Sequence, residues 1–294
     1  MDRVPGYEPG GWGFDSLRMY QIKGVDLVNY AYVTLATDIK YLYRALYLQS
    51  SLERVKSKYP LIILINENLL KYNLIKDVKN YKVIPLINFE KTEKIIRYKF
   101  TLNKFYIFNL IEYDRVCFLD ADLFILSNID NLFEKAQEYD CIYAKYLTGR
   151  YGEDEILPQG RFFTVAPNKN FFNNLLNDLQ INQLTHYDDE HMLKELCFPR
   201  WSKITTFEEL SFLLEQIPIC FHGKWHMHYP NITYKDIITM TDKEVLLLFQ
   251  KEIKRKTISY LRNKNLPLIE DNISKWEKIF WERQFLFDAK EKIE

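Results

Sequence analysis

An apolar segment that stops at two acidic residues constrains the fold of this chain more than any other feature. The segment from Arg115 to Leu119 is RVCFL, and Asp120 and Asp122 follow it with only Ala121 between them. A strand that is apolar along its length is typical of a parallel sheet, in which both faces are covered. In open α/β sheets, ligands bind at the carboxyl ends of the strands. The segment therefore predicts an α/β fold with two carboxylates at the ligand-binding edge.

Asp120 and Asp122 are candidate metal ligands. Two neighbouring carboxylates repel and raise each other's pKa unless a cation holds them together. Hard divalent ions such as Mn²⁺ and Mg²⁺ accept carboxylate oxygens and commonly bind substrate phosphates as well. The alternative is that one Asp caps a following helix, a common role at helix N-termini. Because a cap needs one acid and not two, the apolar strand before the pair favours a metal and diphosphate site.

Strand-like and helix-like segments alternate over about the first 130 residues, which predicts a doubly wound sheet. We expect strands at 29–37, 59–65, 81–86, 115–119, 139–143 and 161–166. We expect helices at 39–55, 68–76, 101–110, 170–179 and 186–196, another helix opening near Asn128, and a surface loop at 146–159. Residues 241–263 and 269–293 have amphipathic helical spacing, which predicts a helical C-terminal extension.

The composition limits the class of protein. The chain has 294 residues, 47% of them hydrophobic, and 40 basic residues balance 40 acidic residues. This balance predicts a globular protein and argues against a general nucleic-acid binder. The four cysteines form no C-x-x-C pair, so a zinc ribbon is not expected. The N-terminus lacks an apolar signal core and no run of eighteen apolar residues occurs, so we expect a soluble, cytoplasmic protein without a membrane span.

A second cluster of chemically active residues lies at 220–228, where the sequence CFHGKWHMH contains three of the five histidines. A histidine at a strand end can bind a metal, glycine allows close backbone approach to a phosphate, and lysine neutralises one. The alternative is a surface turn with scattered imidazoles. In combination with the acidic pair, we interpret His222, Gly223 and Lys224 as part of the same site.

Together these motifs resemble glycosyltransferase family 8, the glycogenin-like retaining sugar transferases. The matching segments, in the family's order, are 31–37, 101–104, 116–122, 128–133, 188–190 and 222–225. The resemblance implies a GT-A type nucleotide-sugar transferase fold, with a mixed, mainly parallel sheet flanked by helices. It also implies a UDP-sugar donor and Mn²⁺ or Mg²⁺. We therefore expect an N-terminal arm at 1–28, a catalytic domain at 29–234 and the helical extension at 235–294.

The resemblance assigns roles to individual residues. Asp120, Asp122 and His222 match the metal ligands, and a second register puts Cys220 at the histidine position. The remaining binding positions are Leu35, Thr37, Asp38 and Tyr41 for uracil and ribose, and Arg97, Lys104, Ala121, Gln159, Gly223 and Lys224 for the diphosphate and sugar. Leu35 and Tyr41 could instead be core residues, and Lys104 a solvated charge.

Asp189 and Glu190 match the family's pair beside the anomeric carbon and, with Lys104, are the predicted catalytic residues. The family usually has an amide at the second position, and a carboxylate, unlike an amide, can attack covalently. A front-face mechanism and a double displacement both stay open. The alternative is that residues 188–190 form the acidic first turn of a helix.

The predicted function is retaining transfer of a hexose from a UDP-sugar to a glycan, protein or small-molecule acceptor. UDP-glucose is the first donor by resemblance, followed by galactose and N-acetylglucosamine donors. A sugar nucleotidyltransferase is one alternative, although residues 34–38 lack the glycine-rich phosphate loop typical of that class. A nucleotide-sugar-binding protein without catalysis is the other, and a homodimer and self-glycosylation stay open.

Overall fold

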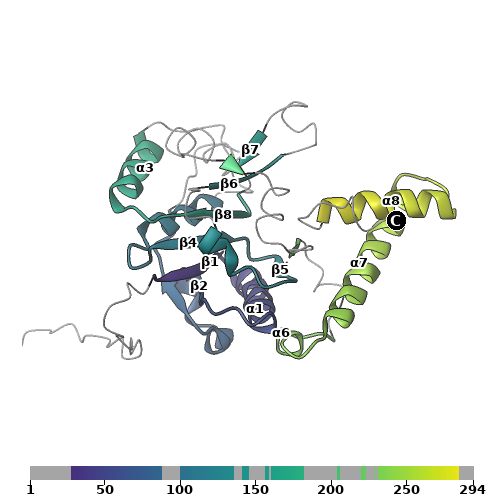
Figure 1. The fold of residues 1–294 in the computed structure, drawn as a ribbon, viewed down its shortest axis with the longest axis horizontal. Coiled ribbons are helices and arrows are strands. Elements are labelled where there is room, and N and C mark those ends of the chain that lie inside the picture. The colour runs from purple at the N-terminus through teal and green to yellow at the C-terminus, as the bar shows by residue number, and fades with distance from the viewer. Residues whose placement is uncertain are drawn as a thin grey trace, which may run out of the picture.

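The core of the protein is a five-stranded sheet with the strand order β3-β2-β1-β4-β8 (Figure 1). The computed structural model describes residues 28–87, 100–135, 141–145, 156–158, 160–181, 204–205, 220–222, 229 and 231–284. The first four strands in chain order are mutually parallel, and the fifth runs antiparallel to β4. Their bounds are β1 Tyr30–Ala36, β2 Leu61–Ile65, β3 Tyr81–Val83, β4 Arg115–Leu119 and β8 Phe162–Val165. The predicted mixed, mainly parallel sheet is confirmed.

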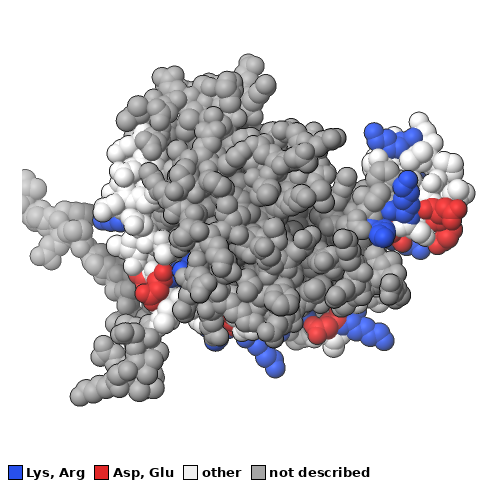
Figure 2. Space-filling model, turned by 45° about the horizontal axis from the view of Figure 1, so that its top comes forward, with Lys and Arg blue, Asp and Glu red and all other residues white. Residues whose placement is uncertain are grey.

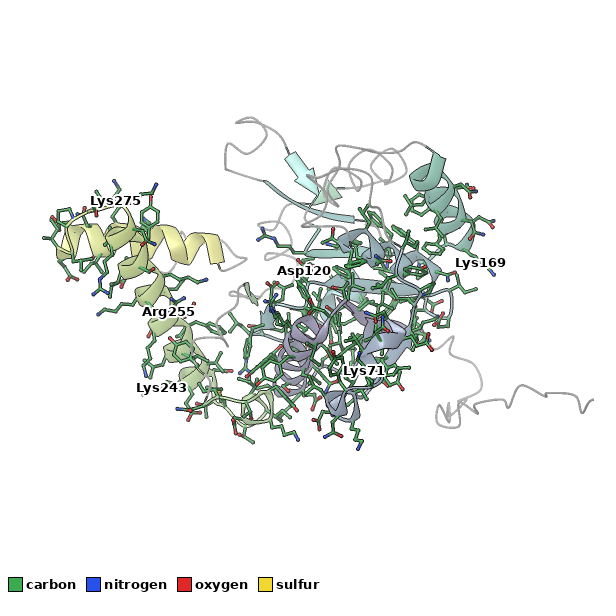
Figure 3. The ribbon with its side chains drawn as sticks, turned by 180° about the vertical axis from the view of Figure 1, so that it is seen from behind. Lys71, Asp120, Lys169, Lys243, Arg255 and Lys275 are labelled. Carbon is green, nitrogen blue, oxygen red and sulfur yellow. The ribbon has the colours of Figure 1, made fainter. Side chains whose placement is uncertain are left out.

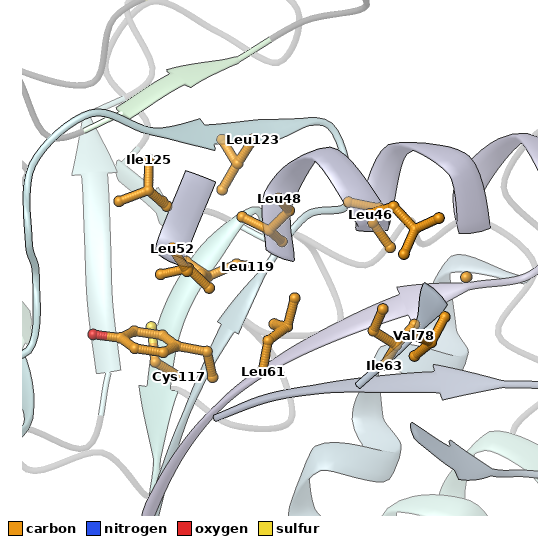
Figure 4. Packing of buried hydrophobic residues seen from close by; sticks show 14 of the residues in the cluster. Leu46, Leu48, Leu52, Leu61, Ile63, Val78, Cys117, Leu119, Leu123 and Ile125 are labelled. Carbon is orange, nitrogen blue, oxygen red and sulfur yellow. The ribbon is translucent and has the colours of Figure 1, made fainter. Parts of the chain in front are cut away.

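Two hydrophobic cores cover the two faces of the sheet. Successive side chains of a strand point to opposite faces, so Tyr32 belongs to one core and Val33 to the other. Helix α1 (Ile39–Arg54) covers the first face, where Leu48 and Leu52 pack near Leu119 (Figure 4). The 3₁₀ helix η3 (Thr101–Asn109) and helix α3 (Lys169–Ile181) cover the second face. Strand β4 is therefore buried on both sides, as its apolar sequence predicts.

Two smaller sheets flank the central one. Strand β5 (Leu123–Ile125) pairs antiparallel with β10 (Cys220–His222). Strand β6 (Cys141–Lys145) pairs with β7 (Ile156–Pro158) and with β9 (Ile204–Thr205). The prediction that 146–159 is entirely a surface loop is wrong, because β7 lies within it. The Ile-Leu-Pro sequence suits a short edge strand, since proline is tolerated at a sheet edge.

Several predicted helices have different geometry. Residues 68–76 form two short 3₁₀ helices, η1 (Glu67–Leu69) and η2 (Asn73–Asp77), and residues 101–109 form η3 in place of an α-helix. Aromatic residues crowd η3, and such residues lose rotamer freedom in an α-helix. Helix α2 (Asn131–Lys135) begins later than the predicted opening at Asn128. The Asn128 side chain instead accepts a hydrogen bond from the Asp130 amide.

The first two C-terminal helices pack onto this central unit, and the third packs against the second. They are α6 (Tyr234–Ile237), α7 (Asp242–Asn263) and α8 (Glu270–Gln284). Thr241 and Glu244 form a capping box that starts α7, and Phe249 of α7 packs on Phe124 of β5 with ring centroids 5.1 Å apart. Charges of both signs are visible on the α7–α8 part of the surface (Figure 2). Across the described helices, none has the length and apolar character that a membrane crossing requires.

Candidate active site

The acidic pair lies where β4 ends, at the carboxyl edge of the central sheet. The Asp120 amide donates to the Arg161 carbonyl (2.8 Å), and the Asp120 carbonyl accepts from the Leu123 amide (3.0 Å). These two hydrogen bonds form a tight turn that holds Asp120 and Asp122 on either side of the buried Ala121. Because β1 and β4 are parallel neighbours, the end of β1 lies at the same edge. The prediction that the pair follows a buried strand is confirmed.

Lys104 is a buried partner of Asp120. Its Nζ donates to the Gly160 carbonyl (2.6 Å), lies 3.6 Å from Asp120 Oδ1 and lies 5.0 Å from the centroid of the Phe118 ring. Only 4% of its side chain is exposed, which excludes the alternative of a solvated surface charge. Burying an ammonium is costly unless it is paired, so Lys104 is held where it faces the carboxylate. Figure 3 shows Asp120 toward the centre of the view, whereas Lys169 and Lys243 lie toward its right and left sides.

Arg44 of α1 is the corresponding partner of Asp122. Its Nη1 lies 4.0 Å from Asp122 Oδ2, and its Cζ lies 4.7 Å from the centroid of the Tyr41 ring. Each acid of the pair thus has a buried basic side chain beside it. The sequence analysis missed Arg44, because its position about one helical turn after Tyr41 places it near that residue but does not reveal that it is buried.

The predicted nucleoside-binding residues gather where β1 passes into α1. Asp38 caps α1, because its Oδ1 accepts from the amides of Lys40 (2.8 Å) and Tyr41 (3.0 Å). Leu35 is buried in the core, as its alternative interpretation holds, whereas Tyr41 is 39% exposed and is not a core residue. The structure therefore places an exposed aromatic ring beside the acidic pair.

Asn66 is a second polar residue that the sequence analysis missed. Its Nδ2 donates to the Thr37 carbonyl (2.8 Å), and its buried Oδ1 has no hydrogen-bond partner within the described part of the chain. It directly follows the apolar strand β2, so the rule that identified the acidic pair would also have found it. Asn66 links the carboxyl ends of β1 and β2 at the edge where the acids lie.

The register of β5 and β10 bears on the predicted third metal ligand. His222 lies opposite Leu123, the residue directly after Asp122, whereas Cys220 lies opposite Ile125, two residues farther along the strand. The backbone therefore favours His222 over Cys220 at the histidine position. Across the described side chains there is no cluster of three or more His, Cys, Asp and Glu residues. The side chain of His222 lies outside the described part of the structure, so its role as a metal ligand beside Asp120 and Asp122 stays a prediction.

Helix α7 brings further charges toward Asp122. Glu252 is fully buried and accepts from Arg255 Nε (2.9 Å) and Nη2 (2.7 Å), and Lys256 Nζ lies 4.0 Å from Glu252 Oε1. Burial lowers the pKa of Lys256, while the negative charges of Glu252 and Asp122 oppose this shift. The C-terminal helix therefore contributes to the electrostatic field at the acidic pair.

Other predicted site residues lie outside the described part of the chain and stay predictions. They are Arg97, Gln159, Asp189, Glu190, Gly223 and Lys224.

Comparisons with known proteins agree with the motifs. No protein-family model matches the chain. Galactinol synthase 1 of Solanum lycopersicum is 27% identical over 186 residues, which cover 55% of this chain and 58% of that protein. Glycogenin-2 of Homo sapiens is 30% identical over 125 residues, which cover 40% of this chain and 25% of that protein.

A solved structure of the glycosyltransferase GlyE of Streptococcus pneumoniae TIGR4 aligns with 78% of this chain and 64% of that chain, at 14% identity and a TM-score of 0.47. The chain spans less than two thirds of the length of either sequence relative. The similarity to these proteins confirms the predicted resemblance of the chain to the glycogenin-like sugar transferases of glycosyltransferase family 8.

Proposed function

We propose that the chain is a metal-dependent retaining glycosyltransferase that moves a hexose from a UDP-sugar to an acceptor hydroxyl. One observation carries the proposal: two carboxylates lie at the carboxyl edge of the sheet, each with a buried cation within 4.0 Å. This is the edge at which open α/β sheets bind nucleotides. The names of the two sequence relatives, a galactinol synthase and a glycogenin, support a sugar-transfer reaction.

In this proposal the donor lies along the sheet edge. The uracil and ribose lie near Thr37 and Tyr41, where the exposed Tyr41 ring offers an apolar face for a base. Asp120, Asp122 and His222 would hold Mn²⁺ or Mg²⁺, and the bound ion would supply positive charge to the leaving UDP.

The protein's own residues prepare the site for this charge. Lys104, itself buried, lies 3.6 Å from Asp120 and adds a positive charge beside it. By resemblance, Gly223 and Lys224 hold the phosphates and Asp189 binds sugar hydroxyls. Glu190 either stabilises the oxocarbenium-like sugar or attacks it, and a covalent glycosyl intermediate on Glu190 would mark double displacement.

A thermal-shift panel of UDP-sugars, beginning with UDP-glucose and run with and without Mn²⁺, tests the proposal. A ligand at one hundred times its dissociation constant stabilises the folded state by about 2.7 kcal/mol, a readable shift. We expect a Mn²⁺-dependent shift that Asp122→Ala abolishes. Asp114→Ala is the matched control, because Asp114 is an exposed acid at the opposite end of β4.

Product analysis then separates the possible activities. Transfer of the sugar, or hydrolysis of the donor, supports the transferase. Binding without turnover supports a nucleotide-sugar-binding protein, and release of pyrophosphate from a nucleoside triphosphate and a sugar phosphate supports a nucleotidyltransferase. Equal shifts in wild type and Asp122→Ala would contradict the proposed site.

A further inference from the structure

Arg44 is a buried cation whose hydrogen-bonding capacity is not fully used. Its side chain is 7% exposed, and neither Nε nor Nη1 has a hydrogen-bond partner among the residues that the structure describes. The 4.0 Å between Nη1 and Asp122 Oδ2 is too long for a hydrogen bond. Buried donors without acceptors are costly, and more so when they are charged. Asp122 therefore compensates the charge of Arg44, but the guanidinium keeps donors that are available to hydrogen-bond a bound anion.

Arg54, on the same helix, shows how α1 satisfies a buried guanidinium when the role is structural. Its Nη2 donates to the Leu126 carbonyl (2.8 Å), and its Nη1 pairs with Asp242 of α7. Among the described residues, Nε of Arg54 alone of its nitrogens lacks a partner. For Arg44, the described residues offer no carbonyl or carboxylate within hydrogen-bonding distance of Nε or Nη1, which separates it from a purely structural arginine.

The position of Arg44 identifies the anion. The guanidinium lies over the Tyr41 ring, with Cζ 4.7 Å from the ring centroid. On one side is the residue proposed to stack on the base, and on the other is an acid proposed to hold the metal. In a nucleotide that spans these two residues, the group between base and metal is the diphosphate. Guanidinium donors form a planar fork that matches phosphate oxygens.

We propose that Arg44 binds the diphosphate of the donor directly and gives the site a nucleotide affinity that does not depend on the metal ion. The proposal rests on the proposed function above and adds a residue to it. Arg44 and Lys104 together balance the charges of Asp120 and Asp122. A diphosphate therefore meets a site whose acidic pair is already compensated before any metal binds.

Titration calorimetry with UDP and with uridine, each in EDTA and in Mn²⁺, tests this inference. We expect wild type to bind UDP in EDTA, and Arg44→Met to weaken that binding about tenfold or more while uridine binding is unchanged. Arg44→Lys should recover part of the loss, because it restores the charge without the fork. Arg54→Lys is the control and should leave UDP binding unchanged.

Each alternative result has a distinct meaning. If Arg44→Met weakens UDP binding only in Mn²⁺, Arg44 merely positions Asp122 and the inference is wrong. Equal losses for uridine and UDP would mean that Tyr41 has moved, which also overturns it. Should Arg44→Met fold poorly, Arg44→Lys decides, and unchanged UDP affinity in EDTA refutes the proposal. Wild type that binds UDP only in Mn²⁺ overturns the inference alone, whereas wild type that binds no UDP at all overturns the proposed function as well.

Discussion

Replacing Asp130 with asparagine should destabilise the fold, because Asp130 is a structural acid that joins several segments. Asp130 is only 5% exposed to solvent. Oδ1 accepts from Tyr32 Oη (3.0 Å) and Ser57 Oγ (2.7 Å), and Oδ2 accepts from the Lys58 amide (2.9 Å) and Asn128 Nδ2 (3.2 Å). All four partners donate hydrogen bonds, and an ionised carboxylate can accept all of them because both of its oxygens are acceptors.

The magnitude follows from this geometry. Asparagine places an NH₂ group where one carboxylate oxygen accepts two hydrogen bonds, so two bonds to a charged group are lost. At about 1.5–3 kcal/mol each, the loss is about 3–6 kcal/mol. Burial, and then the nearby Asp130 charge, raise the pKa of Tyr32 well above its ordinary value, so its hydroxyl stays a donor that needs this acceptor.

Thermal unfolding followed by circular dichroism measures the effect. At about 2–4 °C per kcal/mol for chains of this size class, the midpoint should fall by about 10 °C. The exposed control Asp114→Asn should change it by less than about 2 °C. Asp122→Asn should leave the midpoint near that of wild type but remove the Mn²⁺-dependent donor shift. A midpoint of Asp130→Asn close to wild type would refute the structural role.

Two further predictions concern the attachment of the C-terminal helices. Phe249→Ala should cost about 3–5 kcal/mol in urea unfolding, because it leaves a cavity against Phe124; a loss below about 1 kcal/mol would show that α7 does not pack there. Asp77 accepts from Tyr234 Oη (2.6 Å) and pairs with Lys235, and both lower its pKa. Because the pKa of Asp77 is lower in the folded state than in the unfolded state, ionised Asp77 stabilises the fold at pH values above its unfolded-state pKa. This stability is lost as the pH falls through the folded-state pKa. Asp77→Asn should therefore flatten the decline of the thermal midpoint below about pH 4. Identical acid profiles of variant and wild type would contradict this linkage.

The buried strands were predictable because burial on both faces imposes a local sequence pattern. Strand β4 is apolar at nearly every position, and the acids that end it mark the sheet edge. The antiparallel direction of β8 was not predictable, since strand direction leaves no local pattern in a short buried segment. The 3₁₀ geometry of η3 was also not predicted, because nearly all of its residues are buried and the sequence therefore shows no clear helical periodicity.

The candidate site was predictable where function depends on residue type, and not where it depends on packing. Asp120 and Lys104 were identified from motifs, and the structure brings them within 3.6 Å of each other. Arg44 was not identified, because a single arginine on an amphipathic helix is ordinarily a solvated charge. Its burial follows from how α1 packs on the sheet, which no local sequence pattern encodes.

The two acids of the pair depend on opposite faces of the sheet. Lys104, beside Asp120, belongs to η3, which packs on one face, whereas Arg44, beside Asp122, belongs to α1, which packs on the other. One strand carries both acids, so their spacing is set by β4 and its following turn. The compensating charges come from two separately packed helices. A substitution in either core should therefore alter the charge balance of one acid while the spacing of the pair is kept.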